Sequence, residues 1–182
     1  MLQGLFLDKL PSLEISYADD DPLLWGHTLD GVAVTGSVES ALTAAHDAVV
    51  VAIGDNRIRH DIALRLCSRN EHLLTVIHPT ASVSNRAEIG AGSMVLAGAV
   101  INAGARLGTA VIVNTSASVD HHCLVGDYVH VAPGAHLGGN VTLEEGVFVG
   151  IGASITPGCT IGSWAIVGAG ATVIHDVPAG VT

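Results

Sequence analysis

The chain reads ASVSNR, AEIGAG and SMVLAG over residues 81–98, and this six-residue pattern continues without a slip as far as Val173. A branched aliphatic residue stands third in every repeat. These sixteen positions are Val83, Ile89, Val95, Ile101, Leu107, Val113, Val119, Val125, Val131, Leu137, Leu143, Val149, Ile155, Ile161, Val167 and Val173. Two residues before each one stands Ala, Ser, Val or Cys, and Gly, Asn or Asp often follows it, as residues that tolerate a tight corner.

A repeat of six residues predicts a parallel β-helix, because it is too short for a helix pair and has no heptad seam. Three repeats make one triangular rung, and rungs stack at about 4.8 Å with the aliphatic and small residues pointing inward. Each buried Val, Ile or Leu contributes roughly 1.5–3 kcal/mol, so this core can stabilise a chain with little regular structure. We therefore expect residues 79–182 to form one β-helical domain.

Composition narrows the classes of partner. The 182 residues carry a net charge of −10, with seven Lys and Arg, which argues against binding to nucleic acid or to an anionic membrane. No run of about 18 apolar residues and no signal peptide is recognisable, which favours a soluble cytoplasmic protein without membrane insertion. Cys123 and Cys159 occupy inward positions two rungs apart, too far for a disulfide, and we expect reduced core thiols.

Residues 1–78 do not follow the six-residue period. They predict short strands at 4–8 and 32–34, a helix at 37–45, a buried strand at 48–54, a helix at 57–68 and a last strand at 73–77. Strands and helices in this order indicate a small α/β domain with parallel strands. The prediction is a two-domain chain, with the boundary near residue 78.

Three segments give the chain a family resemblance: VAIGDNRIR at 51–59, HPTASVS at 78–84 and NTSASVDHHCLVGDYVHVAPGA at 114–135. Together they resemble the hexapeptide-repeat sugar acetyltransferases of the PglD and NeuD type. The resemblance implies a left-handed β-helix that binds acetyl-CoA in the cleft between subunits of a homotrimer. It also implies an N-terminal Rossmann-like domain that holds a nucleotide sugar. That domain looks truncated here, because the family's opening strand and Gly-Gly-His loop have no counterpart. At the other end of the chain, the family's Gly-x-Pro-Ala tail next to coenzyme A has no counterpart either.

The expected chemistry centres on His121. Acyl transfer to an amine or hydroxyl needs a base near neutral pH, and free imidazole, with a pKa of about 6.5, suits that task. The resemblance makes His121 the general base. The family commonly has an acid next, which orients the base, whereas His122 stands there in this chain. Adjacent Asp120 is then a candidate to orient the base in its place.

Other site residues follow from the resemblance. His130 matches a second family histidine that contacts the substrate or the acetyl group from the adjacent subunit. Asn114 and Gly139 match positions that meet the thioester and pantetheine arm of acetyl-CoA, although Gly139 also reads as an ordinary turn glycine. In the N-terminal region, the resemblance places Asp8, Gly54, Asp55 and Asn56 at the nucleotide sugar, with Arg59 as a phosphate partner. Capping of a helix explains Asp55 and Asn56 equally well.

The function expected is acetyl transfer from acetyl-CoA to the amino group of a nucleotide-linked amino sugar, in bacterial glycan biosynthesis, without a covalent enzyme intermediate or a metal. O-acetylation of sialic acid or a related sugar is the alternative enzymatic reading. An inactive trimeric scaffold of the same fold is another. A γ-class carbonic anhydrase shares such a coil, but its zinc histidines do not match the spacing of those found here.

Overall fold

A computed structural model describes residues 14–182. The chain divides into two compact units after Asp47. The strand expected at residues 4–8, and with it Asp8, lies outside the described residues. The boundary near residue 78 therefore differs from the division into compact units, because residues 48–77 pack with the repeat region.

The described part of the first unit is a small sheet with one short α-helix. It contains β1 (Tyr17–Ala18), the 3-10 turn η1 (Pro22–Leu24), β2 (Thr28–Leu29), β3 (Val32–Gly36) and α2 (Val38–Thr43). Strand β3 lies between β1, which is parallel to it, and β2, which is antiparallel. Alternate residues of β3 are buried, and Ser37 caps α2 by accepting from the amide of Ser40. The strand at 32–34 and the helix at 37–45 are confirmed.

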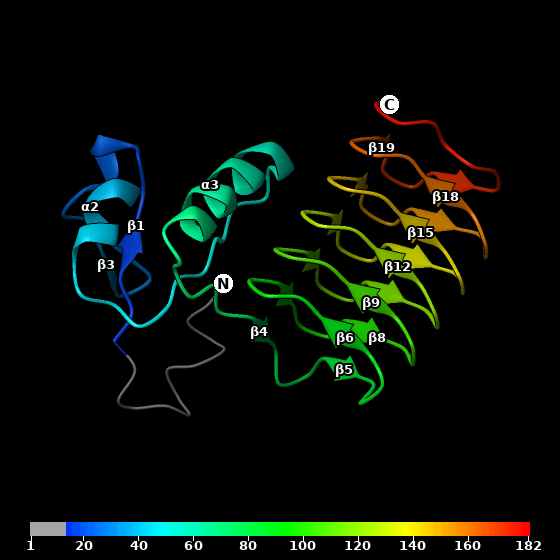
Figure 1. Cartoon of the computed structure of the whole chain (residues 1–182), viewed down its shortest axis with the longest axis horizontal. Helices are drawn as coiled ribbons and strands as arrows, with labels where there is room; N and C mark the ends of the chain where they lie inside the picture. The colour runs from blue at the N-terminus through cyan, green and yellow to red at the C-terminus, as the bar shows by residue number, and fades with distance from the viewer. Residues whose placement is uncertain (1–13) are drawn as a thin grey trace. The chain divides into compact units, whose positions relative to one another are not determined.

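The second unit contains the longer helix α3 (Asn56–Ser68), visible in Figure 1. Its start is determined by Asp55, whose Oδ1 accepts hydrogen bonds from the amides of Arg57 and Ile58, at 2.9 and 3.0 Å. This confirms the predicted helix and its cap. No helix in residues 14–182 combines the length and the apolar character needed to cross a membrane.

The two strands expected around α3 are wrong in extent. Residues 48–54 form only one parallel bridge, between Val49 and Leu73. The segment expected at 73–77 shortens to β4 (Val76–Ile77), which pairs with a strand of the coil eighteen residues later. Ile77 fits the six-residue series one repeat before Val83, so the coil begins earlier than we expected, because its backbone pairing extends to this segment.

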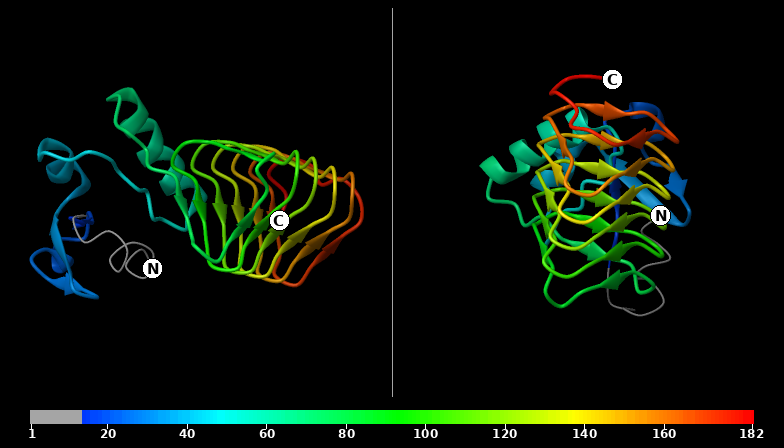
Figure 2. Two further views of the ribbon diagram at one scale, coloured as in Figure 1. Left: turned by 90° about the horizontal axis from the view of Figure 1, so that it is seen from below. Right: turned by 90° about the vertical axis from the view of Figure 1, so that its right-hand side faces the viewer.

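The remaining strands build three parallel sheets of two-residue strands, which Figures 1 and 2 show as stacked rungs. The first sheet contains β4, β7 (Met94–Val95), β10 (Ile112–Val113), β13 (His130–Val131), β16 (Phe148–Val149) and β19 (Ile166–Val167). The second contains β5 (Ser82–Val83), β8 (Val100–Ile101), β11 (Ser118–Val119), β14 (His136–Leu137), β17 (Ser154–Ile155) and β20 (Thr172–Val173). The third contains β6 (Glu88–Ile89), β9 (Arg106–Leu107), β12 (Leu124–Val125), β15 (Thr142–Leu143) and β18 (Thr160–Ile161).

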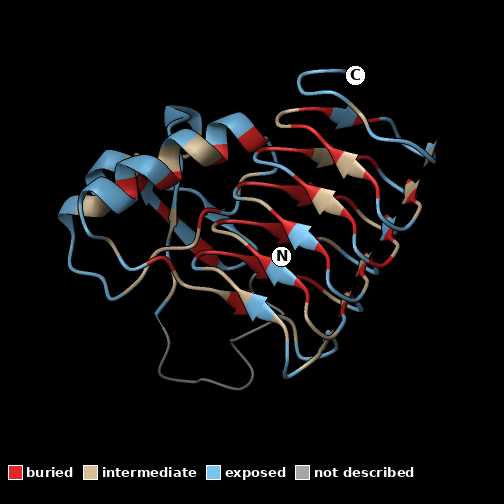
Figure 3. Cartoon of the chain, turned by 45° about the vertical axis from the view of Figure 1, so that its right-hand side comes forward, coloured by how far each residue is buried: buried red, intermediate tan, exposed pale blue. Residues whose placement is uncertain are grey.

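Each rung spans eighteen residues, so a residue lies beside its counterpart eighteen positions later, as Ile112 lies beside His130. The fold is the expected left-handed parallel β-helix. The aliphatic and small positions of the repeat form one continuous core from Val95 to Val167. Figure 3 shows this burial recurring from rung to rung. The repeat thus predicts the fold correctly, because every inward position is apolar.

Glycines after the aliphatic residue have a different role from the one expected. The left-handed backbone occurs two residues later in the repeats from Gly92 to Gly170, at positions such as Ala110 and His122. Gly90, in contrast, is needed for close approach between rungs, because a Cβ there would lie 2.4 Å from the carbonyl oxygen of Gly108. The prediction of corner flexibility at Gly90 is therefore wrong, since the next rung leaves no room for a side chain.

Candidate active site

The candidate catalytic turn joins the second sheet to the third, between β11 and β12. Asp120 opens this turn, and its Oδ1 accepts from the backbone amide of His121 at 2.7 Å and from Nδ2 of Asn102 at 2.8 Å. These two hydrogen bonds, the one from the amide first, lower the pKa of Asp120 below its ordinary value. The carboxylate therefore holds the turn to the rung before it.

His121 and His122 form an exposed pair of imidazoles in this turn. Their Nδ1 atoms lie 3.1 Å apart, and the rings meet edge to face at a centroid distance of 5.3 Å. His122 has a left-handed backbone, with φ of 57°. That conformation turns the two neighbouring side chains to the same side of the turn, so that their Nδ1 atoms share one proton in a hydrogen bond.

Two glycines on adjacent rungs make room for these rings. A Cβ at Gly139 would lie 2.4 Å from Nε2 and Cε1 of His121, and a Cβ at Gly104 would lie 2.8 Å from Cδ2 of His122. Real Cβ atoms do not approach other atoms so closely. Gly139, predicted from the resemblance as a contact of acetyl-CoA, thus has a contact within the chain as well.

Cys123 ends the turn and points into the core, as its inward position predicts. The thiol is buried and donates to the carbonyl of Gly138 at 3.1 Å. Burial raises the pKa of Cys123 above its ordinary value, which disfavours the thiolate. The three cysteines are free thiols, which confirms the reduced state expected of Cys123 and Cys159.

His130 lies in a different environment, on the outer side of the first sheet. It is 8% exposed, packs edge to face on Phe148, and its Nδ1 lies 3.2 Å from the carbonyl of Gly54. Its Nε2 lies 3.0 Å from Nδ2 of Asn114. Burial, assisted by the charge of Arg59, lowers the pKa of His130 from 6.5 to about 4. His130 is therefore neutral at physiological pH, with Nδ1 donating and Nε2 accepting.

His121 and His130 lie far apart on the section of the coil. The turn of His121 joins the second and third sheets, whereas His130 belongs to the first sheet, which is the face opposite that turn in a three-sided coil. Asn114 lies with His130, and Gly139 lies with His121. The structure thus divides the predicted residues into two groups on opposite sides of one chain.

Arg59 corrects a prediction. Its side chain is completely buried, so it has no access to a phosphate. The guanidinium donates to oxygens of Ile53, Gly54, Asn56, Ala110 and Tyr128, at 2.6 to 3.2 Å. Burial lowers the pKa of Arg59 to about 10, which still leaves it charged. Arg59 attaches the segment before α3 to the coil.

Asn56 also contributes to this attachment. Its Nδ2 donates to the carbonyls of Gly146 and Val147, at 3.0 and 3.1 Å, while its Oδ1 accepts from Arg59. All the polar atoms of this amide therefore have partners within the chain. Asp55 caps α3, so capping and docking account for both residues. Gly54 and Asp55 remain exposed, and a Cβ at Gly54 would meet no atom within 4 Å.

Sequence reasoning missed an aromatic cluster under α3. The ring of His60 contacts Tyr128 and Trp164 at centroid distances of 4.7 and 5.5 Å, and Arg57 lies 4.6 Å from the Trp164 ring. Tyr128 and Trp164 both have left-handed backbones. The sequence did contain a signal for this cluster, because Tyr128 and Trp164 are large aromatic residues thirty-six positions apart, at corners where the repeat has mostly small residues.

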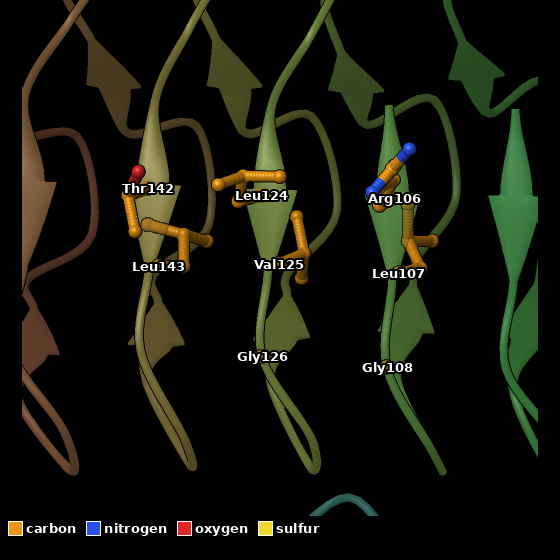
Figure 4. Close-up of a pocket in the computed structure, with 8 residues that line it drawn as sticks. All are labelled: Arg106, Leu107, Gly108, Leu124, Val125, Gly126, Thr142 and Leu143. Carbon is orange, nitrogen blue, oxygen red and sulfur yellow. The ribbon is translucent and has the colours of Figure 1, made fainter. Parts of the chain in front are cut away.

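A shallow hollow lies on the third sheet, and Figure 4 shows its lining residues on three successive strands. They are Arg106, Leu107, Gly108, Leu124, Val125, Gly126, Thr142 and Leu143. Leu124, directly after the turn at Asp120–Cys123, is 49% exposed. Within residues 14–182, no three His, Cys, Asp or Glu side chains are grouped to hold a metal ion.

Comparison with known proteins decides the family. The model of the bacterial transferase hexapeptide (six repeats) matches residues 140–175. The acetyltransferase domain of PglB from Neisseria gonorrhoeae is 41% identical, with a TM-score of 0.85, over 91% of this chain and 80% of that domain. The chain belongs to the hexapeptide-repeat sugar acetyltransferases.

Two further structures place it within this family of acetyltransferases. PerB from Caulobacter crescentus, in complex with CoA and GDP-perosamine, is 38% identical with a TM-score of 0.85, over 91% of this chain and 79% of PerB. WeeI from Acinetobacter baumannii is 32% identical with a TM-score of 0.88, over 98% of this chain and 88% of WeeI. The comparison with curated proteins gives no match.

Proposed function

We propose that the protein transfers the acetyl group of acetyl-CoA to the amino group of a nucleotide-linked amino sugar. The observation that supports this most directly is the 38% identity to PerB, whose structure holds CoA together with GDP-perosamine. The PglB domain was likewise determined in complex with acetyl-CoA. Both likenesses extend over 91% of the chain.

His121 is the proposed general base. The amino nitrogen of the sugar bonds to the acetyl carbon, the carbon–sulfur bond breaks, and His121 accepts the proton that the nitrogen loses. CoA leaves as a thiolate, which takes up this proton from His121 and is released as the thiol. The exposed imidazole of His121 supports this role, whereas neutral His130, with both nitrogens engaged, is suited to hydrogen bonding. Buried Cys123 gives no support to a covalent intermediate.

The turn of His121 fits a thioester. Gly139 brings bare backbone against the imidazole, and Ala103 and Gly104 keep the rung before it small, so that a narrow acyl chain can approach Nε2. Asn114 and His130 are proposed to meet the acetyl group or the sugar amine from their own face. Exposed Gly54 and Asp55, next to His130, are proposed to contact the nucleotide sugar.

A homotrimer is proposed as the active assembly. His121 and His130 lie on opposite sides of one coil, so one acetyl group can meet both only where two chains join. A three-fold ring gives each subunit the same pair of complementary faces and closes the assembly. With a net charge of −10 and no membrane-crossing helix in residues 14–182, we propose a cytoplasmic location.

The test is release of CoA thiol from acetyl-CoA by the purified protein, with GDP-perosamine, a UDP-linked 4-amino sugar and free sialic acid offered separately. We expect release with one or both amino sugars, and a product that has gained one N-acetyl group by mass spectrometry. Release with sialic acid alone would replace N-acetylation by O-acetylation. Binding of acetyl-CoA with no release for any acceptor would support a scaffold.

A further inference from the structure

The side chain of His122 is the group that faces Nδ1 of the base. The two Nδ1 atoms lie 3.1 Å apart, and the hydrogen bond between them needs one proton. If the proton lies on His121, its Nε2 keeps a lone pair and can accept a proton. If it lies on His122, the proton of neutral His121 must lie on Nε2, and the base is blocked. The group that faces Nδ1 of His121 therefore decides whether Nε2 of His121 can accept a proton.

Asp120 does not supply this partner. Its Oδ1 is engaged by the backbone amide of His121 and the amide group of Asn102. The adjacent turns at 102–105 and 138–141 contain only Asn, Ala, Gly and Val, so neither of these turns supplies a titratable side chain. Asp120 is the one carboxylate within the turn at 120–123.

Gly104 and the left-handed backbone fix the position of His122. The φ of 57° points the side chain toward His121, and the ring rests where a Cβ of residue 104 would lie. We propose that His122 is a positioning residue, whose neutral imidazole accepts a hydrogen bond from Nδ1 of His121 and so leaves Nε2 of His121 free for the sugar amine. This inference rests on the proposed function and deepens its mechanism.

The proposal is tested with three replacements of His122 that suit its backbone. His122→Asn places an oxygen where Nδ1 of His122 now lies, since both atoms are bonded to Cγ, and Asn140 already adopts this conformation one rung later, with φ of 59°. His122→Asp adds a negative charge at the same place. His122→Ala removes the acceptor, and Ala110 shows that alanine is accepted at such a corner.

We expect His122→Ala to lower kcat about tenfold or more with unchanged KM, because the base loses its orientation. His122→Asn should stay within about threefold of the parent protein, because an acceptor remains. In His122→Asp, the acidic limb of the rate profile should move to higher pH than in His122→Asn, because a carboxylate stabilises a protonated His121. Asn70→Ala, just after α3, imposes the same left-handed backbone demand, with φ of 59°, away from the pair and should leave activity unchanged.

Two results would overturn the proposal: full activity of His122→Ala, or equal losses in folded His122→Ala and His122→Asn. The tautomer of His121, read by ¹⁵N NMR of the imidazole, is a measurement without substrates. The parent protein and His122→Asn should show the proton on Nδ1, and His122→Ala a mixture; an unchanged tautomer in His122→Ala also overturns it. If the parent transfers no acetyl group to any acceptor, the proposed function fails, and the NMR result still decides the role of His122.

Discussion

The histidines of this coil occupy two contrasting surroundings. His121 and His122 lie in an exposed turn between two sheets, with bare glycine backbone on the adjacent rungs. His130 lies on the opposite face, 8% exposed, where the segment before α3 closes over it. The repeat is the same in both places. The difference is the cover that residues 53–59 provide.

The cover decides which histidine can accept a proton. Burial lowers the pKa of His130 to about 4, so this ring is a fixed donor and acceptor near neutral pH. The cover itself depends on Arg59, whose buried charge binds carbonyls on both the segment and the coil. One face of the coil is thus stabilised by fully engaged polar groups, while the opposite turn stays open for chemistry.

Removing the exposed imidazole of His121 should have the largest effect on activity. We expect His121→Ala to lower the rate of acetyl transfer by about 10²–10⁴-fold, because general base catalysis is lost. Affinity for acetyl-CoA, measured by calorimetry, should hardly change. If His121→Ala kept the parental rate, His121 would not be the base, and the difference in exposure between His121 and His130 would have no catalytic meaning.

The cover is tested by Arg59→Met, which keeps volume but loses every donor. Carbonyls of Ala110 and Tyr128 would remain buried without that partner, and we expect a loss of about 2–5 kcal/mol in the free energy of unfolding. Urea denaturation measures this loss. Arg86→Met, at an exposed position of the coil, is the control and should change stability by less than about 0.5 kcal/mol. Equal losses in both variants would contradict the attachment role.

Stability should also depend on pH through His130. Its folded pKa of about 4 lies below the ordinary value of 6.5, so the unfolded chain takes up the proton first as the pH falls. Stability from this group is complete above about pH 6.5, and about 2 kcal/mol should be lost between pH 7 and pH 5. Denaturant titrations at both pH values measure the loss. His130→Gln should show a smaller loss, and an identical dependence would mean that His130 is not the source.

The smallest effect expected is that of Gly139→Ala. The new Cβ would overlap the ring of His121, which is exposed and can swing aside. We expect about a tenfold lower kcat from the misplaced base, with an unchanged thermal midpoint. Gly168→Ala, where a Cβ meets no atom within 4 Å and φ is not positive, as at Gly139, is the matched control for a methyl group added to the coil. A parental kcat in Gly139→Ala would show that the ring does not need this space.

Much of the coil could be predicted, because its core positions recur at a constant spacing. The inward side chains of Val95 to Val167, the buried thiols and helix α3 with its cap all followed from local pattern. The strands at 48–54 and 73–77 were overestimated. Hydrophobic residues such as Val51 and Val76 are buried as expected, but Val76 pairs with Met94 of the coil, and residues 48–54 have only the bridge from Val49 to Leu73.

The site was predictable only in part. The resemblance gave His121 as the base and His130 as a contact from the adjacent subunit, but it did not show that the two side chains lie on opposite sides of one coil. Arg59 was predicted as a phosphate partner, since a charged residue one turn into a helix is normally exposed. Its burial depends on carbonyls that lie 51 and 69 residues further along the chain. Local sequence contains no signal for such distant partners.

By itself, then, the sequence determined the β-helix, the inward residues, the position of α3 and the turn at Asp120–Cys123, because each depends on neighbours within six residues or on a constant eighteen-residue step. Tertiary structure alone decided which histidine is exposed, which arginine is structural, and which nitrogen of His122 faces the base. These properties depend on desolvation and on hydrogen-bond geometry between distant segments. Such quantities exist only once the chain is folded.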